Sequence, residues 1–308
     1  MILTVTLNTA IDHIIKIPSF LPGETIRSTR SYISIGGKGT DASYILGTLG
    51  FDNIATGFYA GVFGQKMLSL LHERGVSTDF VEVDGETRIS TIVIPEMGDQ
   101  TSLTVDTLEI SKDHLEALSI KYASLLSQAG CVVMGGTPPK SVSLTDYREF
   151  IQLANAKALP TVVDASGASL RAALDSSPTV VKPNRAELGS LVEGEIQSVD
   201  DAVTAGRQIL AEYGSAVVVT LGEDGAVALW HDRTLRIHPL EVPVENTAGA
   251  GDAVLAGIAH ALDQGLDIED GLRLGFGAAA AVMTTPRTAD CKPRDVERFS
   301  DAIRISSV

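Results

Sequence analysis

Cysteines and long apolar runs are scarce in this chain of 308 residues. The two cysteines, Cys131 and Cys291, are too few for a disulfide framework and have no metal-ligand spacing, so we expect a reduced, cytoplasmic protein. No stretch of about 18 apolar residues is present, which argues against a membrane-spanning helix. Residues 1–7 lack the basic flank and cleavage site of a signal peptide and instead predict a buried strand.

Positive charge is also in short supply. Lys and Arg number 24 against 39 Asp and Glu, so the formal net charge is −15. Nucleic-acid backbones and anionic lipid surfaces select basic proteins, and we therefore expect no nucleic-acid or membrane partner. An anionic substrate would have to be bound by a local group of cations against the overall field.

Two common nucleotide-binding motifs are missing. The P-loop pattern GxxxxGK[ST] does not occur, and the glycines at residues 36–39 lack the GxGxxG spacing of a Rossmann dinucleotide site. No internal repeat, low-complexity tract or linker divides the chain. Its length is sufficient for one large core, so we predict a single domain over residues 1–308.

The sequence does contain a regular alternation of short apolar strands and amphipathic helices. This order is typical of an α/β fold in which helices cover both faces of a mostly parallel sheet. The predicted strands are residues 2–7, 131–134, 161–164, 179–181 and 216–221, with a hairpin over 226–230 and 234–238. The predicted helices are residues 40–49, 64–74, 111–127, 143–157, 184–191, 199–213 and one that starts near Ala250.

Two regions interrupt this alternation. Residues 14–35 and 86–105 have a β-like pattern and no helical period. In the second region, residues 91–94 and 101–105 flank a polar turn. Because the two regions are inserted between strand–helix units, they predict a small β lid outside the main sheet. The exposed face of such a lid needs a partner or the substrate to cover it; ordinary surface hairpins are the alternative.

The stretch NTAGAGDAVLAG at residues 246–257 is the strongest candidate for a catalytic element. Gly249 and Gly251 leave the backbone bare where a helix begins. The first N–H groups of a helix lack internal partners and carry positive partial charge, so this turn can bind an anion. Asp252 in the same turn suits a base for an attacking hydroxyl. The alternative is a glycine-rich helix start with an ordinary first-turn acid.

Four further segments are binding candidates with structural alternatives. Residues 35–41 place paired glycines and a lysine ahead of a helix, and Asp12 follows the first strand, where ligands lie in open α/β sheets; a tight turn and a turn acid are the alternatives. Asn184 and Glu187 have capping-box spacing and could also face a metal–phosphate site. Residues 218–225 form a strand and a glycine-bounded turn, which could pass close to a nucleotide or simply join two strands.

These segments together resemble the ribokinase/PfkB family of sugar kinases over nearly the whole chain. Two motifs carry the resemblance: GGKG at residues 36–39 with its following helix, and NTAGAGD at residues 246–252. Further segments look like the branch that contains 1-phosphofructokinase, tagatose-6-phosphate kinase and the minor 6-phosphofructokinase. They are residues 8–12, Thr87-Arg88, residues 164–167 and residues 182–184. The resemblance implies a ribokinase-like three-layer sandwich with a small β lid.

The resemblance also implies roles for individual residues. Asp252 would be the general base, and the anion hole would be formed by Gly249, Ala250 and Gly251. Sugar hydroxyls would be bound by Asp12, Gly36, Gly37 and Asp41. The ATP-binding residues would be Lys182, Asn184, Thr220, Gly222 and Gly225, with magnesium bound by Glu187 through water. ATP and Mg²⁺ are the implied cofactors, a monovalent cation is compatible with the family, and the lid implies a homodimer.

The sequence departs from the family pattern at four positions. Thr9 replaces a proline, and the family's GGKGxN ends here in Asp41. An ionised Asp only accepts hydrogen bonds, so Asp41 should favour a substrate with hydroxyl or amine donors and repel a nearby phosphate. Ser90 and Gly136 stand where relatives have Asn and Ser, which alters two partners for a phosphate or hydroxyl.

Three cations favour an anionic substrate despite these departures. Arg27, Lys38 and Arg88 would converge in an otherwise acidic protein, unless the two arginines are solvated lid residues. The predicted function is transfer of the ATP γ-phosphoryl group to a hydroxyl of a phosphorylated ketohexose: fructose-1-phosphate, fructose-6-phosphate or tagatose-6-phosphate. The alternatives are a kinase for a non-phosphorylated sugar, polyol or nucleoside, and a catalytically idle ligand-binding member, against which the intact Asp252 argues.

Overall fold

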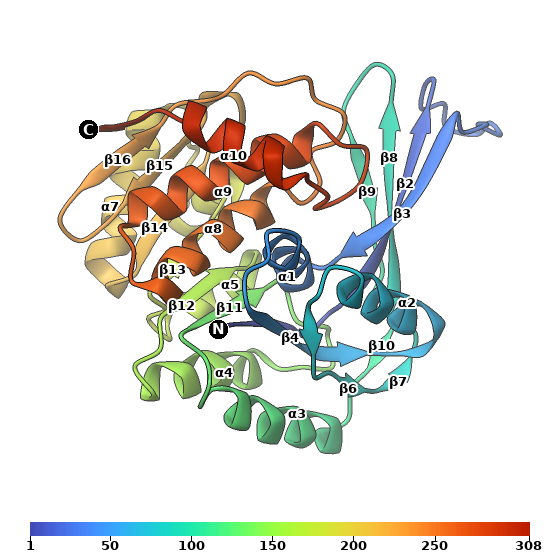
Figure 1. The fold of residues 1–308 in the computed structure, drawn as a ribbon, viewed down its shortest axis with the longest axis horizontal. Helices are drawn as coiled ribbons and strands as arrows, with labels where there is room; N and C mark the ends of the chain where they lie inside the picture. Colours follow the sequence, from blue (N-terminus) through green and yellow to red (C-terminus); the bar gives the residue numbers. More distant parts are fainter.

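A large sheet forms the centre of the molecule in the computed structural model, which describes all 308 residues. The strands from β14 to β5 run parallel, and β15, β16 and β17 extend one edge in antiparallel fashion (Figure 1). In spatial order they are β17 (Ile305–Ser307), β16 (Thr234–Ile237), β15 (Ala226–Leu229), β14 (Ala216–Thr220), β13 (Val180–Val181), β12 (Thr161–Asp164), β11 (Cys131–Gly135), β1 (Ile2–Thr6), β4 (Asn53–Tyr59) and β5 (Ser77–Thr78), with β6 (Val81–Glu82) also on β4.

Helices cover both faces of this sheet and bury one hydrophobic core on each. One face carries α1 (Lys38–Thr48), α2 (Gly61–His72), α8 (Ala250–Gln264), α9 (Ile268–Met283) and α10 (Pro293–Ala302). The other carries α3 (Lys112–Leu125), α4 (Leu144–Ala156), α5 (Gly167–Leu174), α6 (Arg185–Val192) and α7 (Val199–Tyr213). The two cores contain 37 buried residues each, and strand residues alternate between them, with Val133 in one and Val132 and Met134 in the other. The predicted α/β sandwich is therefore confirmed.

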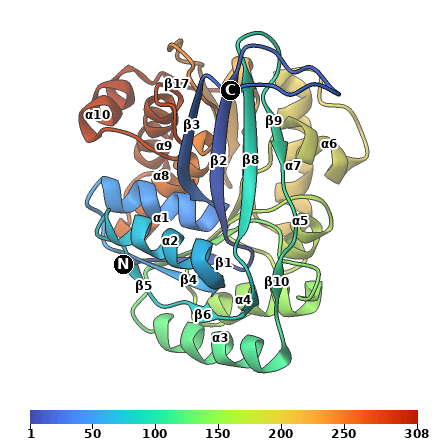
Figure 2. The same cartoon turned by 90° about the vertical axis from the view of Figure 1, so that its right-hand side faces the viewer.

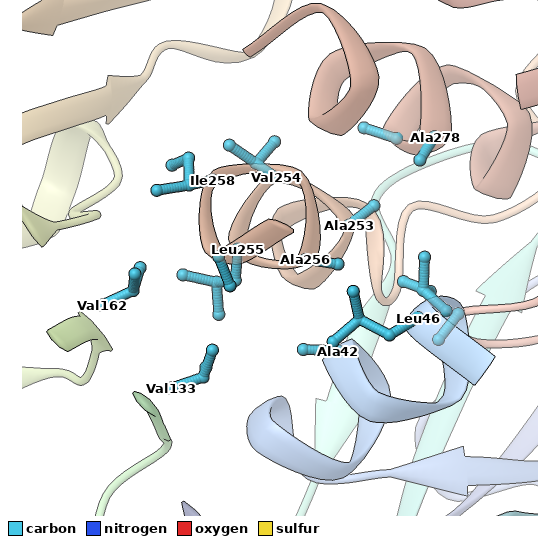
Figure 3. Packing of buried hydrophobic residues seen from close by; sticks show 14 of the residues in the cluster. Ala42, Leu46, Val133, Val162, Ala253, Val254, Leu255, Ala256, Ile258 and Ala278 are labelled. Atoms are coloured by element: carbon cyan, nitrogen blue, oxygen red, sulfur yellow. The ribbon is translucent and has the colours of Figure 1, made fainter. Parts of the chain in front are cut away.

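Helix α8 packs at the centre of one layer. Figure 3 shows Leu255 directed toward Val133 and Val162 of the sheet, while Ala256 lies toward Ala42 and Leu46 of α1. Where α8 crosses α9, a side chain on Gly257 would place its Cβ 2.3 Å from the backbone nitrogen of Gly275, so both helices need glycine at this crossing. The rigid packing of α8 fixes the position of its first turn.

Several elements were not predicted from the sequence. These are β4, α5, α9, α10 and β17, together with the two-residue strands β5, β6, β7 (Asp84–Gly85) and β10 (Leu108–Glu109). In α9, glycines at three positions obscure the helical pattern, although the crossing with α8 requires two of them, Gly271 and Gly275. Helices α1 and α2 also begin two and three residues before their predicted starts at 40 and 64, because glycines precede the periodic residues.

A separate four-stranded sheet stands at one side of the molecule (Figure 1) and faces the viewer in Figure 2. It consists of β3 (Arg30–Gly36), β2 (Ala10–Ile17), β8 (Arg88–Pro95) and β9 (Thr101–Leu103), and a two-stranded ladder of β7 (Asp84–Gly85) and β10 (Leu108–Glu109) lies near its base. The two regions predicted to lie outside the main sheet therefore do so.

Two contacts connect this second sheet to the segment that precedes α8. Lys16 of β2 forms an ion pair with Glu245. Between β8 and β9, Oε1 of Gln100 accepts a hydrogen bond from the hydroxyl of Thr247 at 3.3 Å. None of the helices has the length and apolar composition needed to span a membrane.

Candidate active site

Several predicted site residues, together with Asp164, which was not among them, gather where the main sheet meets the second sheet. Asp164 ends β12, Lys182 directly follows β13, and Asp12 lies on β2 just after the turn that leaves β1. The first turns of α1 and α8 contribute Asp41 and Asp252. These positions are at the carboxyl ends of parallel strands, which is where open α/β sheets bind ligands.

The first turn of α8 presents free backbone donors. Gly249 adopts φ 83°, and a Cβ at this position would lie 2.4 Å from the nitrogen of Ala289, so only glycine fits the turn. The N–H of Ala250 bonds to Thr247, but the N–H groups of Gly251 and Asp252 have no acceptor. They can therefore receive an anion at the positive end of the helix.

A cluster of alternating charges lies beside this turn. Asp164 accepts a hydrogen bond from Lys182 at 2.7 Å and another from Lys38. Burial alone would raise the pKa of Asp164, but the two lysines outweigh it and lower that pKa. The Nζ atom of Lys182 lies 3.3 Å from the position of a Cβ on Gly251, so the lysine charge borders the free N–H groups. Lys38 also lies 3.9 Å from Glu187.

Three buried acidic side chains also lie near this turn. Asp12, Asp41 and Asp252 are 6%, 4% and 8% exposed. Burial, followed by the charge of Asp164, raises the pKa of Asp252 to about 6. Burial also raises the pKa of Asp12 to about 7, although the Thr288 hydroxyl donates to its carboxylate at 2.7 Å. Burial and the two neighbouring carboxylates raise the pKa of Asp41 well above its usual range.

Glycines allow this close approach of carboxyl groups and backbone. A Cβ on Gly36 would lie 2.4 Å from Oδ1 of Asp12, and Gly37 adopts φ 97° at the start of α1. Any larger residue at Gly36 would displace the Asp12 carboxylate. The GGKG turn thus shapes the floor of the acidic side of the site.

The two arginines predicted to bind substrate lie in different environments. Arg88 is only 19% exposed at the start of β8; burial lowers its pKa, and its guanidinium lies 3.6 Å from Asp106. Asn8 donates to the same Asp106 carboxylate at 2.9 Å. Arg27, by contrast, is exposed between β2 and β3, and no ion pair or hydrogen bond joins its side chain to the acidic group.

The segments predicted to bind ATP adjoin the lysine cluster. Asn184 and Glu187 form a reciprocal capping box with two hydrogen bonds of 2.9 Å. The helix-capping role, one of the two roles considered for this pair, is therefore present. The capping bond uses Oε2 of Glu187, while Oε1 is the atom near Lys38. Thr220 forms an isolated bridge with Asn184, which brings the two predicted ATP segments together.

Two glycines shape the turn that follows β14. Gly222 begins a 3₁₀ turn, η1 (Gly222–Asp224), with φ 64° and open space around its Cβ position. Gly225 has a packing role, since a Cβ there would lie 2.4 Å from the carbonyl oxygen of Ile237. Open space at Gly222 is compatible with a nucleotide passing over this turn.

The donor set suits magnesium that arrives with the nucleotide. No group of three or more His, Cys, Asp or Glu side chains is arranged to hold a metal ion. Magnesium retains several waters and commonly binds through substrate phosphates and one or two carboxylates. A single carboxylate near the lysine cluster, Glu187, is consistent with contact through water.

Two residues of the site had no role in the sequence interpretation. Asp164 lies in a segment that supported the resemblance, and its place at the end of a predicted strand was a usable signal. Thr288 had no such signal, because its contact with Asp12 spans 276 residues of sequence.

Comparisons with known proteins agree with this geometry. The profile of the pfkB family carbohydrate kinases matches residues 3–295. The 1-phosphofructokinase of Haloferax volcanii is 33% identical over 312 residues, covering 100% of this chain and 99% of the relative. The tagatose-6-phosphate kinase of Staphylococcus epidermidis is 30% identical over 265 residues, with 85% of each chain covered.

A solved structure is similar over almost the whole chain. Phosphofructokinase-2 from Escherichia coli, in complex with substrates and products, has a TM-score of 0.89 and 27% identity, with 98% of both chains covered. The same enzyme in complex with potassium has a TM-score of 0.86. Since the family profile covers nearly the whole chain, this protein belongs to the pfkB family of carbohydrate kinases and is an ATP-dependent carbohydrate kinase.

Proposed function

We propose that this kinase transfers the γ-phosphoryl group of ATP to a hydroxyl of a phosphorylated ketohexose: fructose-1-phosphate, fructose-6-phosphate or tagatose-6-phosphate. The observation that carries the proposal is the first turn of α8, where free N–H groups, a buried lysine and a carboxylate occupy adjacent positions. Phosphoryl transfer requires stabilisation of developing phosphate charge and an acceptor for the hydroxyl proton. This turn provides both.

In the proposed mechanism, Asp252 accepts the proton of the attacking hydroxyl. The hydroxyl oxygen forms a bond to the γ-phosphorus while the bond from that phosphorus to the β-phosphate oxygen breaks, and ADP leaves. The N–H groups of Gly251 and Asp252 and the ammonium of Lys182 stabilise the charge that develops on the transferring group. A nucleotide-bound magnesium ion would supply further charge neutralisation, with Glu187 on its water shell.

The pKa of Asp252 suits this role. At a pKa of about 6 the carboxylate is ionised at neutral pH and is a stronger base than an exposed aspartate. Activity should therefore fall as the pH drops through about 6 and Asp252 becomes protonated. On the substrate side, Asp12 is placed to accept hydrogen bonds from sugar hydroxyls, because Thr288 occupies only one of its oxygens.

The names of the relatives and Arg88 support a phosphorylated acceptor. The similar enzymes described above act, by name, on phosphosugars. In this chain Arg88 is half-buried near Asp12, so a phosphate could replace Asp106 as its partner. Lys38 is a weaker candidate for the acceptor phosphate, since its ammonium is already bound by Asp164.

A non-phosphorylated sugar, polyol or nucleoside is the second candidate acceptor. The observation that favours it is the group of three carboxyls beside the site, which would repel an anion if all were ionised. The existing pair between Arg88 and Asp106 also reduces the positive charge available to a substrate phosphate.

The second sheet is proposed to act as a lid and as the contact of a homodimer. The sheet and its loops expose several large apolar side chains, and such faces normally need a cover. They are Phe20, Leu21, Ile33, Leu103 and Val105. Replacement of Ile33 by Asp should convert the dimer to a monomer in light-scattering measurements, and a monomeric wild type would remove this part of the proposal.

A coupled ADP-release assay with magnesium and ATP tests the reaction. The acceptors should include the three phosphosugars named above, free fructose, inositols and nucleosides, with and without potassium. We expect turnover on a phosphosugar. Turnover confined to uncharged acceptors would establish the second candidate, and ligand-induced melting shifts without turnover would indicate a binding protein.

A further inference from the structure

A carboxylate of the protein itself lies where the acceptor phosphate is proposed to bind. Oδ1 of Asp106 accepts a hydrogen bond from Nδ2 of Asn8 at 2.9 Å and lies 3.6 Å from Nη1 of Arg88. In the parallel ladder between β2 and β8, Arg88 is the partner of Ala10, two positions before Asp12. Asp106 therefore places a negative charge against Arg88, beside the proposed acceptor side of the site.

Asp106 does not saturate the Arg88 guanidinium. The 3.6 Å contact is the only ion pair of Arg88, and its Nε atom is buried without a hydrogen-bond partner. A guanidinium binds an anion best when two of its N–H groups face two oxygens of that anion. The second donor, Nδ2 of Asn8, belongs to a side chain that is itself buried. The donors are therefore fixed in the fold, and a better-fitting anion than Asp106 could use them more fully.

The segment that carries this carboxylate is loosely held. Residues 104–106 lie between β9 and β10, are exposed, and make no backbone–backbone hydrogen bond. Firm contacts resume at Thr107, whose hydroxyl donates to the carbonyl oxygen of Glu86 at 2.6 Å. A few exposed residues without backbone hydrogen bonds rearrange at a low free-energy cost. The carboxylate can therefore withdraw while β9 and β10 keep their pairing.

A substrate phosphate and the Asp106 carboxylate would compete for one cation. A phosphate monoester carries about −1.5 to −2 charges at neutral pH and presents several acceptor oxygens, whereas a carboxylate carries a single charge. Two anions at one guanidinium repel each other at short range, so the anion that binds more tightly displaces the other. An uncharged sugar lacks the charge needed to displace Asp106.

We propose that Asp106 is an internal competitor that occupies the anion position at Arg88 in the free protein and withdraws when a phosphorylated acceptor binds. Displacement of Asp106 reduces the net binding free energy of any anion at this position, so weakly charged anions bind poorly there and a phosphate remains able to enter. Asp106 is thus a specificity-determining residue. The inference rests on the proposed phosphosugar kinase function, but the competition itself can be measured without a sugar.

Calorimetric binding of inorganic phosphate tests the competition. Asp106→Asn should bind phosphate about three- to tenfold more tightly than the wild type, because the amide is not an anion and does not compete for the guanidinium. In an Arg88→Ala background the same substitution should have no effect. The comparison cancels any phosphate bound at the first turn of α8, which all four proteins share.

Two further variants separate competition from simpler effects. Asp99→Asn removes a carboxylate from the exposed turn between β8 and β9, where it forms no ion pair, and should leave the phosphate affinity unchanged. It therefore controls for the lower net charge of the protein. Asp106→Ala also removes the hydrogen bond from Asn8 and should bind phosphate as tightly as Asp106→Asn. Thermal melting confirms that each variant is folded.

Steady-state kinetics test whether the competition acts on the acceptor. With the phosphosugar that the ADP-release assay identifies, Asp106→Asn should lower the acceptor KM by about three- to tenfold, and free fructose should show no such gain. Phosphate binding that is unchanged or weaker in Asp106→Asn would overturn the proposal, and so would an acceptor KM that does not fall. Tighter phosphate binding without turnover of any phosphosugar would confirm the competition and show that the proposed function is wrong, so the two failures are distinguishable.

Discussion

Buried carboxyl groups have opposite pKa shifts on the two sides of the first turn of α8. On the proposed ATP side, Asp164 is buried between Lys38 and Lys182, and its pKa is lowered. On the acceptor side, Asp12 and Asp41 have few cationic neighbours, and their pKa values are raised. Burial is similar on both sides, so the neighbouring charges account for the difference.

An acidic protein can thus bind an anionic ligand on one side of this turn and a hydroxyl-bearing ligand on the other. Paired lysines on the proposed ATP side offset the net charge of −15 where we propose that phosphates bind. Unpaired carboxyls on the other side retain affinity for protons and for hydroxyl donors. Asp252 lies between the two groups with an intermediate pKa of about 6.

The largest effect should follow from removing the proposed base, Asp252, between the two sides. Asp252→Asn should reduce kcat by at least about 10²-fold while largely preserving the acceptor KM, because the amide cannot take a proton. Steady-state kinetics with a melting curve as the folding control will measure this. Near-normal turnover would reject Asp252 as the base.

Removal of the Asp164 carboxylate, which Lys38 and Lys182 share, should strongly destabilise the fold. Asp164→Ala leaves Lys182, which is 4% exposed, without its partner, and should lower the free energy of unfolding by about 3–5 kcal/mol. The exposed pair of Asp79 and Lys121 provides the control, where Asp79→Ala should cost less than about 1 kcal/mol. Urea denaturation of both variants checks the difference, and equal losses would contradict the contrast between buried and exposed pairs.

On the acceptor side, loss of a carboxylate should increase stability. The pKa of Asp12 is about 7 in the folded protein and about 4 in the unfolded chain, so its neutral form stabilises the fold at low pH and this contribution is lost as the pH rises through 7. Asp12→Asn should therefore raise the free energy of unfolding by about 1–3 kcal/mol at neutral pH or above. The gain should shrink as the pH is lowered toward about 4; a gain independent of pH would indicate another cause.

The smallest effect is expected for Arg88, which lies at the start of β8 on the proposed acceptor side. Arg88→Ala should raise the KM for a phosphosugar by about tenfold and leave the KM for ATP unchanged, since the charged neighbours of Arg88 are Asp12 and Asp106. Arg30→Ala removes an exposed arginine from the same sheet and should change neither constant. An unchanged acceptor KM in Arg88→Ala would exclude Arg88 from the substrate site.

Local patterns allowed much of the architecture to be predicted. The alternation of apolar strands and amphipathic helices led to the sandwich, and the two regions without helical period led to the second sheet. The prediction missed α9, because its glycines allow close packing against α8 and α10 and weaken the amphipathic signal. It also missed α5, a helix of only eight residues.

Only part of the candidate site was predictable, because local patterns reveal helix starts but not contacts between distant segments. Asp252 and the glycines before it could be recognised, since a helix start with bare N–H groups is encoded within a few residues. For Asn184 and Glu187, the same spacing served both interpretations, and the structure shows the capping box. The ion pairs of Asp164 and the hydrogen bond from Thr288 join distant segments and left no local pattern.

The sequence by itself therefore determined the layered fold and an anion-binding turn followed by an acid, because both arise from backbone geometry and side-chain periodicity over short ranges. Only the tertiary structure decided the ionisation of the acids. Asp41 alone suggested an ionised acceptor that repels phosphate, whereas burial and the charges of Asp252 and Asp12 raise its pKa well above the usual range and favour its neutral form. A pKa depends on burial and on charges within a few ångströms, and these neighbours are assembled only when α1, α8 and β2 pack together.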